Sequence, residues 1–457
     1  MKRLALFLVL VLILSTLFSS CVSISSGKDD VEKLMDKVDK TMSKLKSYES
    51  DMKMDMTFGE GNSRVTSETI ARGVLEFRRG MLSYYNQTSQ TKLRVGDSDT
   101  IVVEDLVAFD GEKIYLMESS EDESGKICSV ADAKEFDEYM DDEAEFDMHI
   151  KDAFEKHVEV NEDSYTVTLG SYNMDAINDM IVELGLDNDF FDFDIVDADV
   201  KLNVDKKFRA DTMEVHFYEN IDEDPVISIT VTYSKYNDAE RPEMDVSGYT
   251  EVADVRVLEW MNESLDDKKD EKSGRFYLEQ YNKIVYKDNR NSPVKINYDY
   301  SYDVKYTDTD DNFTCTIGQR VVKEETTLEY SGGYTVVKDK SGKTISSNNA
   351  YTNDQMRDHI AQMLSVATVP AVSEIKNIEK VEDGVYRIDC KISDIDSYKS
   401  VITSRHDKYV GYTYTVTVCL DGEQVTSIEY SVEVEGETYV YLSYGLFKLV
   451  VEEADTE

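Results

Sequence analysis

The chain has 457 residues, and its 94 Asp and Glu against 50 Lys and Arg give a formal net charge of −44. This charge excludes direct binding to nucleic acid or to anionic headgroups, because both need a basic patch. A hydrophobic content of 41% with 30 Tyr and 4 Pro excludes a disordered chain, and the length predicts two or three domains.

The N-terminal segment has the order of a secretory signal. Two positive residues precede an apolar run over residues 4–14, and Ser19 and Ser20 then precede Cys21. The run is shorter than the ~20 residues that a membrane span needs, which favours a cleaved signal over an uncleaved anchor. Residues 1–20 are therefore predicted to be a signal peptide.

The cysteine at the end of this segment carries a more specific signal. Small residues directly before Cys21 resemble the bacterial lipobox, although Phe18 stands where that motif usually has leucine. The resemblance implies a diacylglycerol on the Cys21 thiol and a lipidated tether over residues 21–30, which would anchor the chain to a membrane outside the cytosol. Two acyl chains hold a protein more firmly than one. An ordinary secreted protein is the alternative.

The residues after the tether change from a helical to a strand period. Apolar residues at three-and-four spacing predict an amphipathic helix, and they are Val31, Leu34, Met35, Val38, Met42 and Leu45. Alternation of apolar and polar residues then predicts antiparallel strands with one wet face. The alternating segments begin at Met52, Leu75, Tyr165, Val200, Met213 and Ile227.

The same order of elements recurs downstream at a nearly constant distance. Three pairs of features are each separated by 221 residues: Val31 and Val252, Asp110-Gly111 and Ser331-Gly332, and Tyr165 and Tyr386. Later pairs slip by a few residues, as loops of unequal length allow. The pattern predicts an internal duplication, with chance patterning as the alternative.

The boundary between the copies is predicted in a polar stretch that contains Pro242 and Gly248. The predicted domains are residues 31–250 and 251–452, followed by a tail at 453–457. Because a sheet with one apolar face needs a cover, the helices of each copy are expected to lie on that face. The predicted fold is α+β, with two tandem curved antiparallel β-sheets, each like a half-barrel and covered by helices on its concave face.

This element order in an acidic exported chain resembles the lipoprotein-carrier superfamily, with its LolA/LolB-like and LppX-like proteins. The phrase SYESDMKMDM at residues 47–56 is similar to segments of Firmicutes lipoproteins. The resemblance covers residues 31–452 as two copies. It implies a Gram-positive host and an apolar concavity that holds an acyl chain or another amphiphile, but it assigns no ligand residue.

Methionines of the first helix and the first strand are expected to face one another. Met lines promiscuous apolar grooves because its side chain is flexible and polarizable, and it also fills ordinary cores. The residues predicted to line a lipid cleft are Met35, Met42, Met52, Met54, Met56 and Phe58. Core packing is the alternative for all six.

Other candidate sites lack part of their motif. Asp308, Asp310 and Asn312 have the spacing of a calcium loop, but Phe313 stands where the tight turn needs Gly. Gly342-Lys343-Thr344 ends like a phosphate loop whose first glycine is missing. The five histidines are scattered, and neither a GxSxG elbow nor a Cys/His cluster exists. No cofactor, metal site or catalytic residue is therefore expected.

Two further features have a plain interpretation and a more specific one. The acid-rich stretch from Asp187 to Asp199 is expected to be a polar edge, with weak calcium binding as the alternative. Cys390 falls on the apolar face of its predicted strand and Cys419 on the polar face of another. A disulfide between opposite faces is geometrically awkward, so none is predicted for this pair.

The expected function is binding without catalysis. The predicted protein is a membrane-anchored extracytoplasmic lipoprotein that holds an apolar or amphiphilic ligand between sheet and helices. The alternative is an interaction module, such as an adhesin, sensor or inhibitor, that binds protein or glycan through Tyr-rich faces. A hydrolase is a third hypothesis, and it needs His, Ser and carboxylate groups in one cleft. The sequence names no protein partner.

Overall fold

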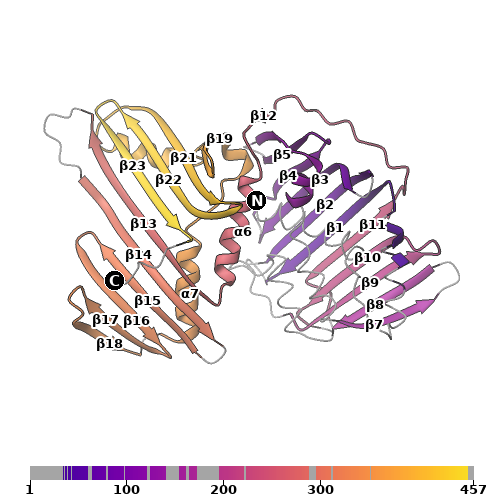
Figure 1. Ribbon diagram of the computed structural model, residues 1–457, viewed down its shortest axis with the longest axis horizontal. Helices are drawn as coiled ribbons and strands as arrows, with labels where there is room; N and C mark the ends of the chain where they lie inside the picture. The colour runs from indigo at the N-terminus through magenta and orange to yellow at the C-terminus, as the bar shows by residue number, and fades with distance from the viewer. Residues whose placement is uncertain are drawn as a thin grey trace. The chain divides into compact units, whose positions relative to one another are not determined.

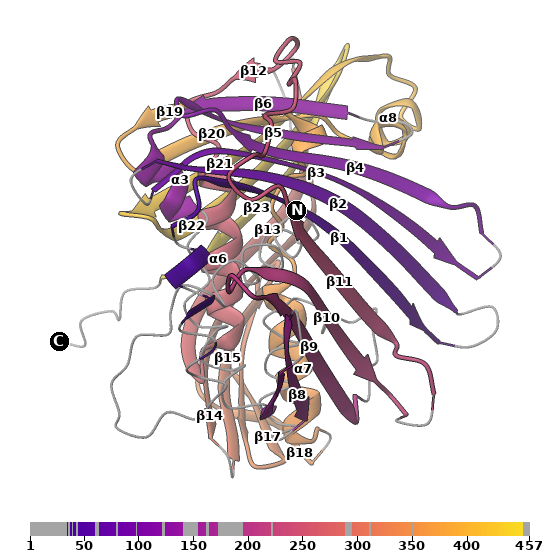
Figure 2. The same ribbon diagram turned by 90° about the vertical axis from the view of Figure 1, so that its right-hand side faces the viewer.

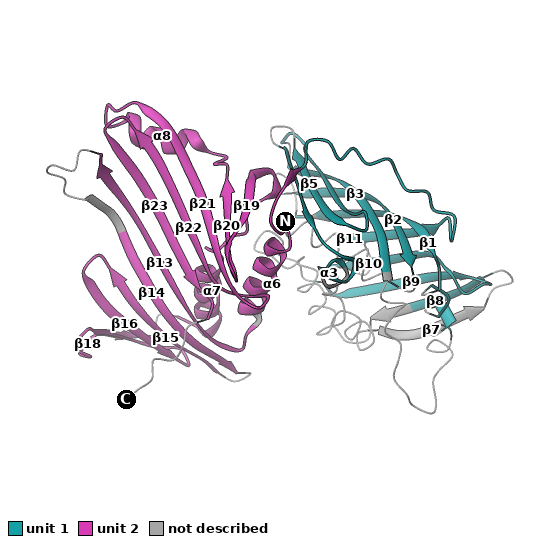
Figure 3. Cartoon of the chain, turned by 45° about the horizontal axis from the view of Figure 1, so that its top comes forward, with its two compact units in different colours: residues 1–249 teal, residues 250–457 magenta. Residues whose placement is uncertain are grey.

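The computed structural model divides the chain into two compact units, residues 1–249 and 250–457 (Figure 3). It describes residues 34–450 apart from gaps at 35–36, 39, 43, 60–63, 79–80, 97, 121–123, 140–153, 161–163, 172–194, 221–222, 288–294, 310–311 and 350. The predicted domain boundary lies one residue from this division. The predicted signal peptide, tether and tail lie outside the described residues.

The first unit is built on one antiparallel sheet (Figure 1). Its strands are β1 (Ser47–Phe58), β2 (Val65–Arg78), β3 (Met81–Val95), β4 (Ile101–Phe109), β5 (Lys113–Ser120), β6 (Ser124–Val130), β7 (Phe154–Val160), β8 (Ser164–Ser171), β9 (Asp197–Asp205), β10 (Ala210–Tyr218) and β11 (Ile227–Ser234). The helix α3 (Ala133–Tyr139) packs against β3. Several strands are long and visibly curved (Figure 2), as predicted.

The second unit has an 11-stranded antiparallel sheet. Its elements are β12 (Thr250–Glu251), α6 (Val257–Asp270), β13 (Ser273–Tyr286), β14 (Lys295–Thr309), β15 (Asn312–Val321), β16 (Glu324–Ser331), β17 (Tyr334–Asp339), β18 (Thr344–Asn348), α7 (Asn353–Leu364), the 3-10 turn η2 (Val372–Glu374), β19 (Ile375–Glu382), β20 (Val385–Cys390), α8 (Ile395–Thr403), β21 (Tyr409–Asp421), β22 (Gln424–Gly436) and β23 (Tyr439–Lys448). The two-residue β12 is not part of this sheet.

Both units use the same strand order. The first sheet runs β6-β5-β4-β3-β2-β1-β11-β10-β9-β8-β7, and the second runs β18-β17-β16-β15-β14-β13-β23-β22-β21-β20-β19. The strands that hold Tyr165 and Tyr386, β8 and β20, occupy the same place in the two orders. The turns at Asp110-Gly111 and Ser331-Gly332 also join equivalent strands. This agreement supports the predicted duplication.

The expected cover of helices is where the prediction fails. Strands make up most of the described chain, so the fold is mainly β rather than α+β. In the second unit α6 packs against β22, α7 against β15, and α8 against β21 and β22. A helix is about 10 Å wide and strands lie about 4.8 Å apart, so each helix covers about two strands. Three short helices cannot cover eleven strands.

The face of the second sheet on which the helices lie is called here the inner face. Tyr306 of β14 donates a hydrogen bond to the carbonyl oxygen of Lys268 in α6, at 2.9 Å. Arg357 of α7 lies over the Phe313 ring, and Ile402 of α8 joins a buried cluster with Ile284. The helices therefore occupy both ends of the inner face of the central strands and leave a stretch of it between them.

The turn between β15 and β16 places a β-branched residue in a strained conformation. Val322 has a φ of 57° and is 57% exposed. Positive φ at the first central residue of a two-residue hairpin favours Gly, and Val is an outlier there. Val322→Gly should therefore raise the free energy of unfolding by about 1 kcal/mol.

Thermal unfolding of the purified chain checks this prediction. The matched control is Val321→Gly, because Val321 is also exposed but does not have a positive φ. Glycine gives no conformational relief at that position and weakens a strand, so the control should be destabilised. A lower melting temperature for Val322→Gly than for the wild-type chain would contradict the strain argument.

Candidate functional site

The residues predicted to line a lipid cleft are only partly described. Cys21 and Met35 lie outside the described residues, and so does the side chain of Phe58, whose backbone belongs to β1. Met42, Met52, Met54 and Met56 are all buried. Burial fits the core-packing alternative and a filled groove equally well.

The three strand methionines form part of a continuous apolar face. Their partners on β11 are Val231, Ile229 and Ile227, for Met52, Met54 and Met56 respectively. All three partners are buried as well. The predicted alternation along β1 is confirmed, because Asp51 and Lys53 between the methionines are exposed.

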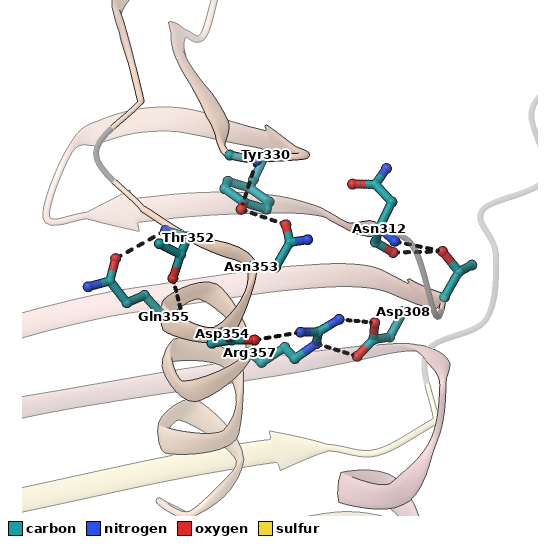
Figure 4. Close-up of polar contacts among 10 residues, drawn as sticks. Asp308, Asn312, Tyr330, Thr352, Asn353, Asp354, Gln355 and Arg357 are labelled. Atoms are coloured by element: carbon teal, nitrogen blue, oxygen red, sulfur yellow. Dashed lines mark hydrogen bonds and ion pairs between the residues drawn. The ribbon is translucent and has the colours of Figure 1, made fainter.

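The calcium-loop candidate in the second unit serves to attach a helix instead. Arg357 of α7 donates from Nε and from a terminal nitrogen to the two carboxylate oxygens of Asp308, each at 2.7 Å (Figure 4). The hydrogen bonds from Arg357 hold the pKa of Asp308 below its ordinary value. Asp310 lies outside the described residues. Among the described residues no group of three His, Cys, Asp or Glu could hold a metal ion.

The start of α7 is fixed by its own polar side chains. Thr352 and Gln355 form a capping box, in which the side-chain oxygen of each accepts a hydrogen bond from the backbone N–H of the other (Figure 4). The hydroxyl of Tyr330 donates to the Asn353 amide oxygen at 2.8 Å. The capping box satisfies free N–H groups of the helix start, and the Tyr330 contact joins that start to β16. The cluster is therefore explained by the attachment of α7 to the sheet.

Two other sequence candidates are also structural. Lys343 belongs to the turn between β17 and β18, where its backbone N–H donates to the Asp339 carboxylate at 3.0 Å. That turn is a hairpin rather than a phosphate loop. Cys390 and Cys419 are free thiols on different strands, as predicted, and burial raises the pKa of Cys390 to about 12.

One histidine does meet a carboxylate. The ring of His216 contacts Asp199 at 3.1 Å through Nδ1, and Tyr218 donates to the same carboxylate at 2.8 Å. Ser228 is the cross-strand partner of His216 in the register. No hydrogen bond joins Ser228 to His216 in the described part of the chain. These four residues lie on the polar face of the first sheet, and they line neither of the cavities described below.

A cavity of about 420 Å³ lies on the inner face of the second sheet, between the helices. It is called here the tyrosine cavity, and its lining residues are Gln280, Asn282, Val366, Thr368, Glu374, Lys391, Ile392, Ser393, Asp394, Tyr398, Tyr414, Tyr430, Val432, Ser443, Tyr444 and Gly445. Its volume lies in the range of ~300–1,000 Å³ that is typical of ligand pockets. None of its residues was predicted as a site residue.

The floor of the tyrosine cavity is a polar and small-residue break in an otherwise large apolar face. Inner-face residues along β13 are Phe276, Leu278, Gln280, Asn282 and Ile284, and along β23 they are Phe447, Gly445, Ser443, Tyr441 and Tyr439. The register pairs Gln280 with Gly445 and Asn282 with Ser443. The small side chains on β23 therefore lie beside the polar ones on β13, and the missing side chain of Gly445 contributes to the hollow.

The walls of the tyrosine cavity come from segments that are far apart in sequence. One wall is the loop after α7, which the Tyr430 hydroxyl fixes by donating to the carbonyl of Thr368 at 2.7 Å and accepting from its N–H at 2.8 Å. The other wall is formed by residues 391–394 and by Tyr398 of α8. Because Val366, Thr368, Ser393 and Asp394 are exposed, the cavity opens to solvent.

The charged groups of the tyrosine cavity already have partners within the chain. Glu374 bonds to the Ser393 hydroxyl and accepts from the backbone N–H of Ala371. Asp394 caps α8 by accepting from the N–H of Ser397, and Lys391 donates to the carbonyl of Ser373 at 3.2 Å. These contacts position the walls.

Three neutral polar side chains of the cavity have no such partner, whereas Gln280 accepts a hydrogen bond from the Tyr300 hydroxyl. The side chains of Asn282, Ser443 and Tyr414 make no hydrogen bond to any residue that the structure describes. Burial raises the pKa of Tyr414 and of Tyr430, so both hydroxyls stay protonated at neutral pH. The cavity thus offers an amide and hydroxyls to a ligand, beside the rings of Tyr398, Tyr414 and Tyr430.

A sequence signal for this site exists but is weak. The alternating face of residues 276–284 turns from apolar to polar at Gln280 and Asn282 and back to apolar at Ile284. This break can be interpreted only when β13 is known to lie beside β23, which supplies Ser443 and Gly445.

A second, smaller cavity of about 290 Å³ lies along α7 and includes His359.

Among the described helices, none combines the length and the hydropathy of a membrane span. This finding concerns helices only.

Comparisons with known proteins give no assignment: no family model and no curated protein matches the chain. A candidate outer membrane protein from Bacteroides fragilis is 8% identical over 90% of this chain and 99% of that chain, with a TM-score of 0.20. A transferrin binding protein B mutant from Haemophilus parasuis is 8% identical, over 89% of this chain and 76% of that chain, with a TM-score of 0.13. The β domain of the Bordetella autotransporter BrkA is 6% identical over 88% of this chain and 98% of that chain, with a TM-score of 0.12. At these TM-scores the similarities support no inference about function.

Proposed function

We propose that the chain is a lipid-anchored, non-enzymatic binding protein of the bacterial cell envelope, which holds a small ligand in the tyrosine cavity. One observation carries the proposal: Asn282, Ser443 and Tyr414 present unpaired hydrogen-bonding groups in a cavity that opens to solvent. Polar groups in such recesses are normally paired, so these groups bind water or a ligand. The export signal and the acidic composition support a place outside the cytosol.

Binding is tested by thermal shift of the full-length chain in mild detergent against separate panels of neutral sugars, amines, nucleotides and fatty acids. We expect one panel to raise the melting temperature, because a ligand that binds only the folded state stabilises it. The shift should disappear in Gly445→Val, whose side chain would enter the cavity. If no panel stabilises the chain, the proposed binding function is wrong.

The lipid anchor makes a separate prediction. Cys21→Ala should move the protein from the membrane fraction of its host to the soluble fraction, because the acyl chains would have no thiol to join. Cys419→Ala is the matched control and should fractionate like the wild-type chain. Immunoblots of both fractions provide the measurement. If Cys21→Ala stays in the membrane fraction, the anchor is not at this cysteine.

An acyl chain along the methionine face of the first unit remains a second candidate ligand. The buried face of Met52, Met54 and Met56 with their partners on β11 favours it, since Met adapts to flexible apolar ligands. Lipid mass spectrometry of the purified chain tests this candidate, and a lipid-free protein that takes up no fluorescent fatty acid would exclude it. The resemblance to lipoprotein carriers remains a prediction that rests on the same test.

A further inference from the structure

We infer that the tyrosine cavity binds a neutral saccharide, whose hydroxyls bond to Asn282, Ser443 and Tyr414 and whose ring lies against a tyrosine. This inference rests on the proposed binding function and names its ligand class. It follows from three properties of the cavity, namely its polar floor, the state of its charged groups and its aromatic lining.

The polar floor argues against an acyl chain at this place. A hydrocarbon on the floor would bury the side chains of Asn282 and Ser443 without giving them hydrogen bonds. Each unsatisfied buried polar group costs about 1–3 kcal/mol, so these two would offset part of the gain from burying an apolar tail. A ligand that carries its own donors and acceptors avoids this cost.

The charged groups argue against an anionic ligand and do not call for a cationic one. Glu374 and Asp394 stand against Lys391 alone, so the lining is net negative and repels phosphate or carboxylate groups. Both carboxylates already accept hydrogen bonds from the chain, from Ala371 and Ser397. The groups left for a ligand are an amide and hydroxyls, which both donate and accept.

Sugar hydroxyls also donate and accept, which is the pattern that an amide and a hydroxyl match together. Tyr398, Tyr414 and Tyr430 add rings with an electron-rich face and an apolar body. The apolar C–H face of a sugar ring packs on such a surface while its hydroxyls reach the floor. Tyrosine loses little conformational entropy on binding, which suits it to this contact.

Gly445 provides the variant that tests the site. A Cβ built on it would meet Tyr430 at 3.7 Å and Gln280 at 3.8 Å, which are ordinary contacts, and its φ is not positive. Valine favours strands, so Gly445→Val should fold and fill the floor. The matched control is Gly411→Val in β21, where a Cβ meets nothing within 4 Å.

The experiment is calorimetry of the full-length chain with a panel of neutral mono- and disaccharides, and with choline and spermidine as cationic competitors. We expect one sugar to bind, with affinity reduced at least tenfold in Gly445→Val and unchanged in Gly411→Val. If circular dichroism shows that Gly445→Val is unfolded, Asn282→Ala replaces it and should reduce the affinity about tenfold, which corresponds to one hydrogen bond of ~1.4 kcal/mol.

The outcomes separate the two levels of the proposal. Sugar binding that Gly445→Val removes and Gly411→Val keeps supports the saccharide inference. Binding of an amine or another non-sugar ligand with the same variant pattern overturns the saccharide inference and leaves the binding function standing. Sugar binding that is unaffected by Gly445→Val or by Asn282→Ala places the sugar elsewhere and also overturns it. The absence of any ligand overturns both.

Discussion

Replacing Arg72 and Lys235 together with methionine should lower the free energy of unfolding by about 3–5 kcal/mol at neutral pH, because the change leaves a buried carboxylate unpaired. That carboxylate belongs to Glu49 in β1, whose side chain is 3% exposed. Arg72 and Lys235 each donate to one of its oxygens at 2.9 Å. The methionine side chains preserve most of the volume of the two cations.

The pH dependence of this effect has a defined sign. Burial of Glu49 by itself would raise the pKa, but the hydrogen bonds from Lys235 and Arg72 outweigh burial and lower it. A lowered folded-state pKa gives stability above the unfolded pKa and loses it as the pH falls through the folded pKa. In the double variant only burial remains, so the folded pKa rises and the destabilisation shrinks as the pH falls toward the unfolded pKa.

Urea unfolding at pH 7 and at pH 4.5 measures both parts of the prediction. Lys53→Met is the control, because Lys53 pairs with Asp55 on the same strand at an exposed position. Exposed ion pairs contribute about 0–1 kcal/mol, so the control should change little. The buried-charge argument would be contradicted if the double variant lost no more free energy of unfolding than the control. It would also be contradicted if the loss in the double variant were larger at pH 4.5 than at pH 7.

Phe136→Ala should lower the free energy of unfolding of the first unit by about 3–5 kcal/mol. Phe136 is fully buried on α3, and its ring stacks on the ring of Phe109. The distance between ring centroids is 4.6 Å for Phe109 and 5.6 Å for Tyr85. Helix α3 has seven residues and is too short to be stable alone. Its attachment to β3 and β4 therefore depends on this ring, and the alanine variant leaves a cavity beneath the helix.

Two spectroscopic signals can localise this loss. Trp260 is the single tryptophan of the chain and lies in α6 of the second unit. Because each unit has its own large sheet and core, the fluorescence midpoint of Trp260 should stay near that of the wild-type chain while the circular dichroism transition shifts. Val130→Ala, at a 65% exposed position at the end of β6, should change stability by less than about 0.5 kcal/mol. Equal effects of the two variants would refute the anchoring role of Phe136.

Much of the fold follows from local patterns in the sequence. Alternation at Met52, Met54 and Met56 correctly predicts β1, and alternation from Ile227 correctly predicts β11. The equal spacing of Tyr165 and Tyr386 correctly predicts equivalent strands. These features depend on residues within a few positions of one another, or on simple repetition, and a single sequence contains both.

The tyrosine cavity depends on information that local patterns lack. Gln280 and Gly445 become neighbours only because β13 pairs with β23, and alternation does not specify which strands pair. The helix cover was overestimated for a related reason. A periodic pattern can indicate that a helix is present, but it does not indicate how few of the eleven strands a short helix such as α8 covers.

The position of β1 has a consequence for how each unit assembles. The first strand of the unit lies in the middle of its sheet and pairs with β11, the last strand, as β13 pairs with β23. Neither sheet can be completed until the final strand of its unit has been synthesised. Such non-local closure slows folding. A chain that folds late can remain unfolded while it is threaded through an export channel, and the shared strand order gives both halves this delay.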